Sequence, residues 1–283
     1  MIINTHTRES MMLGICDYFS VSTGDLVVLF EKAGREAHKN TYLDGDILNK
    51  IIENFIDSNM PSTRIDKILF FHLSRRLNSI KDNYPGKNLF DLLTSDNETT
   101  RFLKNHGIEF LPVDDYIDLI YKGEIIPLTD SFQDHVPYLR WRLGHNENRI
   151  DYCFNGFMLK DLLYKNHYAR DLSQVPEFIS VLLSFLKRRD LIEEYYKNST
   201  YYCFEYCVPL SKIFFDSDEK LSNEEKQRYL LSQVLKRLYD YHFSEQRYMF
   251  DHDNPIIRLH DTDTMDEKYY VSIEKITEEM LRY

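Results

Sequence analysis

The hydrophobic pattern of the chain changes its period once, close to residue 60, and this change limits the folds that are open to it. Before that point apolar residues recur at helical spacing in three segments: Met11–Val21, Gly24–His38 and Ile47–Ser58. Directly afterwards, Ile65–Ser74 is a compact apolar and aromatic run that predicts a buried strand. The sequence therefore predicts a helical unit over 1–60, either a separate subdomain or a lid, before a different architecture over 61–283.

Helices and strands are mixed in the second part without the regular alternation of a doubly wound sheet, which favours an α+β fold. The predicted strands are Val136–Leu143 and Arg149–Phe154, joined as a hairpin, and then Tyr201–Pro209, Ile256–His260 and Lys268–Ile273. The predicted helices are a short one after the capping box at Ser95, a short one over Asp114–Tyr121, a long one from Pro176 to about Tyr196 with Ser173 as its cap, and one after the capping box at Ser222.

The overall charge argues against a protein that coats nucleic acid. The chain carries 35 Lys and Arg against 46 Asp and Glu, a formal net charge of −11, whereas phosphate binding needs clustered basic residues. No apolar run approaches the roughly 20 residues of a membrane span, and the first residues lack the apolar core of a secretory signal. The four cysteines form no CxxC pair. We therefore expect a reduced, cytoplasmic protein without a membrane partner, in which a local basic cleft is still allowed.

Three short segments carry residue types that are common in active sites, although the sequence has no GxxxxGK[ST], GxSxG or HExxH motif and no GxGxxG after a strand. The first is the end of the strand at His72, followed by Ser74, Arg75 and Arg76; the second is Asn155–Asp161; the third is Asp266–Ile273. Each also has an ordinary structural explanation, respectively a core histidine, a strand-to-helix junction and a solvated start of a strand.

Taken together and in this order, the three segments resemble the NAD-dependent ADP-ribosyltransferases that place a His, an aromatic residue and a Glu in a split-sheet cleft. Phe71–Ser74 looks like the strand of that family that reads FHxS or FHxT. Gly156 is followed by an Asp, a Lys and a Tyr at similar offsets, at Asp161, Lys165 and Tyr168. Glu267, which precedes two tyrosines and a valine, looks like the late catalytic strand. The resemblance extends at most from Ile65 to the end of the chain and implies a mixed, mainly antiparallel split sheet.

The resemblance also implies a role for each candidate residue. Glu267 would hydrogen-bond the ribose of NAD and stabilise the positive charge that develops when the nicotinamide bond breaks. His72 would donate to the adenosine ribose, Ser74 would belong to the same site, and Arg75 or Arg76 would bind the pyrophosphate. The ring that stacks on nicotinamide stays open among three residues: Phe157, Tyr269 and Tyr270.

In this interpretation NAD is a substrate, no metal is expected, and ADP-ribose is transferred to a macromolecule, either nucleic acid or protein. A toxin or an antiviral, phage-defence effector is the biological setting that the resemblance suggests.

Two other classes of function stay open. Acidic residues and a histidine surround a late predicted strand and could bind Mg²⁺ or Mn²⁺ in a nuclease, although polar loops explain them equally: Asp251, Asp253, His260, Asp261 and Asp263. A non-enzymatic protein-interaction module could instead use an exposed patch of tyrosines: Tyr195, Tyr196, Tyr201 and Tyr202. The interaction module predicts no cleft that unites His72 with Glu267.

Overall fold

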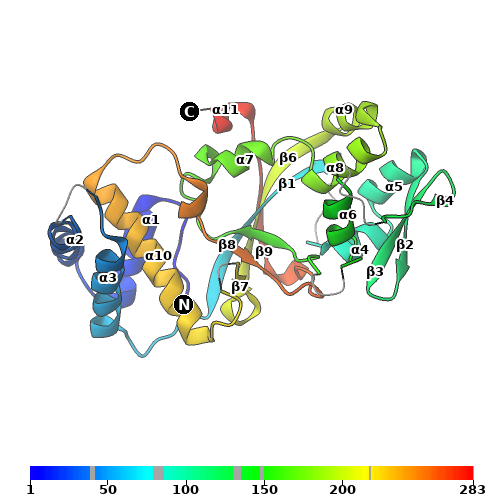
Figure 1. The fold of residues 1–283 in the computed structure, drawn as a ribbon. Coiled ribbons are helices and arrows are strands. Elements are labelled where there is room, and N and C mark those ends of the chain that lie inside the picture. Colours follow the sequence, from blue (N-terminus) through cyan, green and yellow to red (C-terminus); the bar gives the residue numbers. More distant parts are fainter. Residues whose placement is uncertain (39–41, 79–85, 130–134, 147–149, 217, 283) are drawn as a thin grey trace.

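The computed structural model describes residues 1–38, 42–78, 86–129, 135–146, 150–216 and 218–282. Its centre is a sheet with the strand order β7-β8-β5-β1-β6-β9, in which neighbouring strands are antiparallel (Figure 1). These strands are β1 (Lys67–Leu77), β5 (Asn155–Phe157), β6 (Ser199–Pro209), β7 (Phe214–Phe215), β8 (Ile256–Arg258) and β9 (Tyr270–Lys275). A smaller sheet, β2-β3-β4, consists of β2 (Ile108–Val113), β3 (Tyr116–Tyr121) and β4 (Glu124–Ile125). The predicted α+β fold is confirmed.

The pairing of β1 with β6 is the longest in the molecule and runs in continuous register from Lys67 opposite Pro209 to Leu77 opposite Ser199. Both strands were predicted from their apolar and aromatic runs, and both are mostly buried. Because side chains alternate along a strand, each of the two faces of this pair packs against a different group of residues. The β1–β6 pair therefore divides the interior of the protein.

The helices form three groups around the sheet (Figure 1). The first group is α1 (Arg8–Phe19), α2 (Thr23–Ala37), α3 (Gly45–Asn59) and α10 (Asn223–Phe243). The second group is α4 (Leu89–Thr94), α5 (Glu98–Asn105), α6 (Val136–Arg142), α8 (Glu177–Phe185) and α9 (Arg189–Lys197), next to the small sheet. The third group is α7 (His167–Asp171) and α11 (Glu278–Leu281). Among the described residues no single helix is both long and apolar enough to cross a membrane; α1 and α2 meet the criterion only as a pair bent by 100°.

In the first group, α2, α3 and α10 begin at the predicted caps, whereas α1 begins at Arg8, three residues before the predicted Met11. The Ser22 side chain accepts from the backbone N–H of Asp25, and the Asp44 carboxylate accepts from the first turn of α3. Ser222 and Glu225 form the predicted capping box at the start of α10. The buried residues of α1, α2 and α3 share one hydrophobic core with α10 and with Phe70 of β1. The helical segment over 1–60 is thus packed on the sheet through α10.

Three predicted elements are wrong. Residues 150–154 of the predicted strand Arg149–Phe154 form no strand, and β5 begins only at Asn155. In the other two, the buried residues have a different period from the one predicted. The segment predicted as the first strand of a hairpin is helix α6, in which Val136, Leu139 and Leu143 are buried at helical spacing; residues 147–149 of that predicted hairpin lie outside the described residues. The segment predicted as a helix over Asp114–Tyr121 contains strand β3, where Ile117 and Leu119 are buried in alternation.

Two helix boundaries also differ from prediction. The long helix expected from Pro176 is two helices, α8 and α9, because Lys187 between them has a left-handed backbone with φ of 58°. The N-cap of α8 is Pro176 and not Ser173. Helix α5 is capped by Asn97, whose side chain accepts from Thr99 and Thr100, and not by Ser95.

A buried ion pair fixes α10 to the segment that follows β5. The Nε of Arg237 donates to Asp161 at 2.9 Å, and the hydroxyl of Tyr241 donates to the same carboxylate at 2.8 Å. The side chains of Arg237 and Asp161 are 2% and 7% exposed. Removing one partner of such a pair leaves the other charge buried and uncompensated.

We expect Asp161→Ala to lower the free energy of unfolding by about 3–5 kcal/mol, since Arg237 then loses its counter-charge inside the protein. The measurement is urea denaturation followed by circular dichroism. The control is Glu245→Ala, which removes one side of an ion pair that is 77% exposed and should change stability by less than about 0.5 kcal/mol. Equal denaturation midpoints for the two variants would contradict the stabilising role of Asp161.

Candidate functional site

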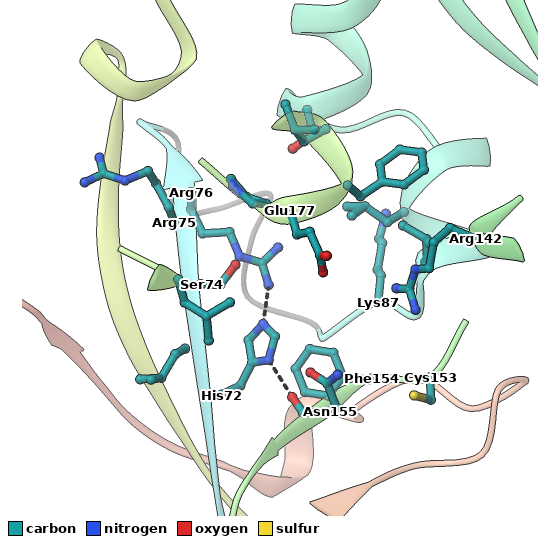
Figure 2. Close-up of a pocket in the computed structure, with 18 of the residues that line it drawn as sticks. His72, Ser74, Arg75, Arg76, Lys87, Arg142, Cys153, Phe154, Asn155 and Glu177 are labelled. Atoms are coloured by element: carbon teal, nitrogen blue, oxygen red, sulfur yellow. Dashed lines mark hydrogen bonds between the residues drawn. The ribbon is translucent and has the colours of Figure 1, made fainter. Parts of the chain in front are cut away.

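A cavity of about 200 Å³ lies beside the second half of β1, facing the second group of helices (Figure 2). Its polar and charged lining includes His72, Ser74, Arg76, Lys87, Arg142 and Glu177. The residues predicted on β1 are therefore brought together at one cavity. Aromatic side chains complete the walls, among them Phe154 and Tyr138.

The position of these residues follows from the alternation of side chains along β1. His72, Ser74 and Arg76 are two residues apart and so lie on one face of the strand, the face that also carries Phe70. The Phe154 ring packs on both Phe70 and His72, with centroid distances of 5.6 and 4.2 Å. The first half of this face is thus buried in the core, and the second half opens into the cavity.

Gly156 allows the chain to approach β1 closely at this point. A Cβ on Gly156 would lie 2.4 Å from Cε1 of Phe70 and 2.7 Å from the carbonyl oxygen of Phe71. The second contact is with backbone, which cannot move aside without breaking the sheet. The absence of a side chain therefore lets the chain at Asn155 reach His72.

His72 is held as a neutral imidazole of defined tautomer. Its Nδ1 lies 2.7 Å from the carbonyl oxygen of Asn155, and since a carbonyl only accepts, Nδ1 carries the proton. The Nε2 atom is then an acceptor, and the guanidinium of Arg76 lies 3.4 Å from it. Burial, with the charge of Arg76 in addition, lowers the pKa of His72 from 6.5 to about 3, against the opposing effect of the Asn155 hydrogen bond. The expected role of His72 as a donor to a ribose disagrees with this geometry, because Nε2 offers a lone pair.

Arg76 is a buried cation that has no counter-charge among the described residues. The residue is 9% exposed, its guanidinium lies 5.4 Å from the Phe204 ring, and its Nε has no hydrogen-bond partner. Within the described part of the chain, no carboxylate lies within ion-pair distance of Arg76, and burial lowers its pKa. A buried unpaired charge is costly, so this arrangement favours an anion in the cavity.

The other charged residues at the cavity are only partly committed to partners. Lys87 donates to the hydroxyl of Ser95 at 2.7 Å, and Arg142 pairs with Asp151 at 2.5 Å. Glu177, in the first turn of α8, lies near the hydroxyl of Tyr138, whose pKa is raised mainly by burial and further by this carboxylate. Figure 2 shows the Glu177 carboxylate directed toward the same space as the Arg76 guanidinium.

Arg75 has a structural role that separates it from Arg76. On the opposite side of β1 its guanidinium donates to the carbonyl oxygens of Ser173 at 2.8 Å and Ser199 at 2.9 Å. It also stacks on the ring of Tyr196, 4.0 Å from the centroid. Arg75 therefore ties β1 to the start of β6 and to the segment before α8. Arg75 also borders the cavity, but its guanidinium is committed to backbone oxygens, so of the two candidate arginines Arg76 keeps a donor without a partner.

The other residues expected at an NAD site do not line this cavity. Glu267 is exposed in a 3₁₀ turn, Glu267–Tyr269, just before β9. That turn follows Met265, whose backbone N–H bonds the carbonyl of Gly86, next to Lys87. The segment of Glu267 thus passes beside the cavity wall, on the side of Lys87, without entering the lining. Its catalytic role stays a prediction.

The three candidate stacking rings are engaged elsewhere. Phe157 is buried opposite Phe71 in the β5–β1 register, on the face of the sheet away from His72. Tyr269 and Tyr270 are partly buried against the main core, and the ring of Tyr270 packs edge-on against Tyr206. The aromatic side chains that do line the cavity, Phe154 among them, are not the ones predicted from the sequence.

The residues predicted for a metal site do not form one. They lie at the two ends of β8: Asp251 and Asp253 before the strand, and His260, Asp261 and Asp263 after it. Asp261 accepts from the backbone N–H of Tyr152 at 2.8 Å. Among the described residues, the one group of potential ligand atoms lying within 4.8 Å of one another is Asp151, Cys153 and Asp261. Asp151 of this group already pairs with Arg142.

The prediction of an exposed patch of tyrosines is also wrong. Tyr195 and Tyr201 are buried, with exposed fractions of 1% and 3%, whereas Tyr196 is 38% exposed. The hydroxyl of Tyr201 donates to the carbonyl of Ala169 at 2.7 Å. Tyr195 is buried from helix α9, whereas Tyr201 and Tyr202 face different cores because successive side chains of β6 point to opposite faces of the sheet.

Sequence reasoning did not single out Lys87, Phe154 or Glu177, and Arg142 lay within the predicted strand Val136–Leu143. No motif marks them, because each comes from a different segment and reaches the cavity through tertiary packing. Comparison with known proteins adds no further candidate: no protein family, no curated protein and no solved structure matches the chain.

The depressed pKa of His72 predicts how acid affects stability. Between pH 6.5 and about 3 the unfolded chain binds a proton at His72 that the folded protein does not, so stability falls as the pH falls through this window. We expect His72→Gln, whose amide can still donate to Asn155, to flatten this dependence by at most about 1.4 kcal/mol per pH unit.

The measurement is urea denaturation at a series of pH values from 7 to 4. His252→Gln is the control, because the side chain of His252 is 82% exposed and lacks the burial that depresses the pKa of His72. If both variants leave the slope of the wild type unchanged, His72 is not a buried neutral base.

Proposed function

We propose that the cavity binds a nucleotide, with its phosphate at Arg76, and that this nucleotide is NAD, used as the donor in ADP-ribosyl transfer to a macromolecular target. The observation that carries the proposal is the buried guanidinium of Arg76, which faces a cavity without a carboxylate partner among the described residues. A phosphate oxygen would supply the missing charge and accept from the fork of the guanidinium.

The surroundings of Arg76 favour an anion that also carries a ring. Lys87 and Arg142 line the same cavity and add positive charge. The walls include the rings of Phe154, Tyr138, Phe178 and Tyr195, which provide flat apolar surface for a base. At about 200 Å³ the cavity is smaller than the 300–1,000 Å³ typical of sites for whole ligands. It therefore suits one nucleotide half of NAD, with the other half outside.

The transfer reaction is assigned from the sequence resemblance, and two features of the cavity agree with it. His72 lies on the strand expected to bind NAD and faces the cavity. Cleavage of the nicotinamide bond needs a carboxylate near the ribose, and the cavity offers Glu177, while Glu267 lies in the adjoining segment. The target, nucleic acid or protein, follows from the resemblance alone.

We expect AMP and NAD to bind the wild-type protein and Arg76→Gln to weaken that binding at least about tenfold, because a hydrogen bond to a charged group is lost. The same variant should be as stable as the wild type or more so without ligand, since an unpaired buried charge has been removed. Isothermal titration calorimetry and thermal unfolding measure the two effects.

Arg189→Gln, which removes an exposed arginine at the start of α9, is the control and should bind as the wild type does. Adenosine tests the phosphate directly and should bind at least about tenfold more weakly than AMP. Equal affinity for adenosine and AMP in the wild-type protein would contradict an anion site at Arg76.

For the reaction, we expect the purified protein to release nicotinamide from NAD, and Glu267→Gln to lower the rate about 100-fold if the sequence-based role of this carboxylate is correct. Chromatography of the released nicotinamide measures the rate, with Glu278→Gln, an exposed glutamate of α11, as the control. Undiminished turnover in Glu267→Gln would remove Glu267 from the mechanism. Absence of turnover in the wild type would refute the transferase assignment but not nucleotide binding.

A further inference from the structure

The cavity contains hydrogen-bond acceptors as well as cations, and this combination limits its ligand further. The Nε2 of His72 is an acceptor because Nδ1 is committed as a donor to Asn155. The carboxylate of Glu177 is a second acceptor and is directed into the same space (Figure 2). Both lie close to the Arg76 side of the cavity, where the phosphate is proposed to bind.

Neither acceptor receives a short hydrogen bond from a cation of the described residues. Nε2 of His72 accepts only at 3.4 Å, from the guanidinium of Arg76. Among the residues that the structure describes, Glu177 has no ion-pair partner within 4.0 Å, and the donor that interacts with it is the hydroxyl of Tyr138. A ligand that offers only acceptors, such as inorganic phosphate, would add no donor to either group.

A ribose supplies the missing donors. Its vicinal hydroxyls lie a few bonds from the 5′-phosphate, and a carboxylate that accepts from a ribose hydroxyl is a common element of nucleotide sites. The neutral imidazole is suited to the same task, because its pKa of about 3 keeps the Nε2 lone pair available throughout the physiological range.

We infer that the cavity selects ribonucleotides over 2′-deoxyribonucleotides, with Glu177 and Nε2 of His72 accepting from the ribose hydroxyls while Arg76 holds the phosphate. This selectivity rests on the proposed function, since it requires that a nucleotide occupies the cavity. It goes further by assigning the sugar and by giving Glu177 a role in ligand recognition.

A simpler role for Glu177 would be to stabilise the helix start. It lies in the first turn of α8, where an acidic side chain interacts favourably with the helix dipole. That role predicts an effect of its removal on stability and none on the choice between two sugars. The preference for one sugar over the other therefore distinguishes the two roles.

The experiment measures dissociation constants by calorimetry for the four ribonucleoside 5′-monophosphates and their four 2′-deoxy counterparts. For the best-bound base we expect the ribonucleotide to bind at least about tenfold more tightly than its deoxy form. In Glu177→Met, which keeps the length of the side chain but has no strong acceptor, this ratio should fall below about threefold. The control Glu193→Met, on the exposed face of α9 with 77% of the side chain accessible, should keep the wild-type ratio.

Each of the other possible results contradicts one specific part of the proposal. Equal binding of ribo- and deoxyribonucleotides by the wild type overturns the selectivity and leaves the nucleotide site intact. A wild-type preference that persists in Glu177→Met overturns the assignment to Glu177. Failure of all eight compounds to bind overturns the proposed nucleotide site, and the selectivity with it.

Discussion

The antiparallel pairing of β1 with β6 is the constraint on which the rest of the structure depends. Its register is continuous over both strands, and each strand is an apolar run interrupted by a few polar side chains. Successive side chains of a strand point to opposite faces. A shift of the pairing register by one residue would therefore turn His72 and Arg76 away from the cavity and Arg75 toward it. The apolar residues at the start of β1, buried against α10 and the N-terminal helices, hold this register.

One face of the pair therefore has two different parts. Its first half is packed, with Phe70 and Tyr206 among the most buried side chains of the protein. Its second half carries His72 and Arg76 into a cavity that the second helical group closes from the other side. The opposite face is filled by Phe71, Phe157 and their neighbours. The cavity is thus an unfilled continuation of the core, and this explains how an arginine comes to be buried there.

Arg76 contrasts with Arg237, the other deeply buried arginine discussed above. Arg237 has Asp161 as its counter-charge, and the hydroxyl of Tyr241 donates to the same carboxylate. Within the part of the chain that the structure describes, Arg76 contacts the imidazole of His72 and an aromatic ring, neither of which neutralises it. A folded chain that keeps an uncompensated cation loses stability, and sites that are maintained at such a cost are commonly functional.

Much of the fold could be predicted from local pattern. The helices before residue 60, the strands β1 and β6, and the start of α10 at Ser222 all have strong periodicity or side-chain caps. The failures occur in short segments, where a few apolar residues fit either period. In α6 the residues Val136, Leu139 and Leu143 were taken for a strand, and in β3 the residues Ile117 and Leu119 were taken for a helix. Such segments adopt the structure that their neighbours impose.

The sequence by itself determined the α+β class and the presence of His72, Ser74 and Arg76 on one face of a buried strand, because alternation along a strand is a local property. Only the tertiary structure decided which of the two adjacent arginines faces the cavity and which residues stand opposite it. Lys87, Arg142 and Glu177 come from three separate segments, and Glu267 lies in the segment beside them. Their meeting depends on how the helices pack against the sheet, and packing is decided by the whole core and not by any one stretch of sequence.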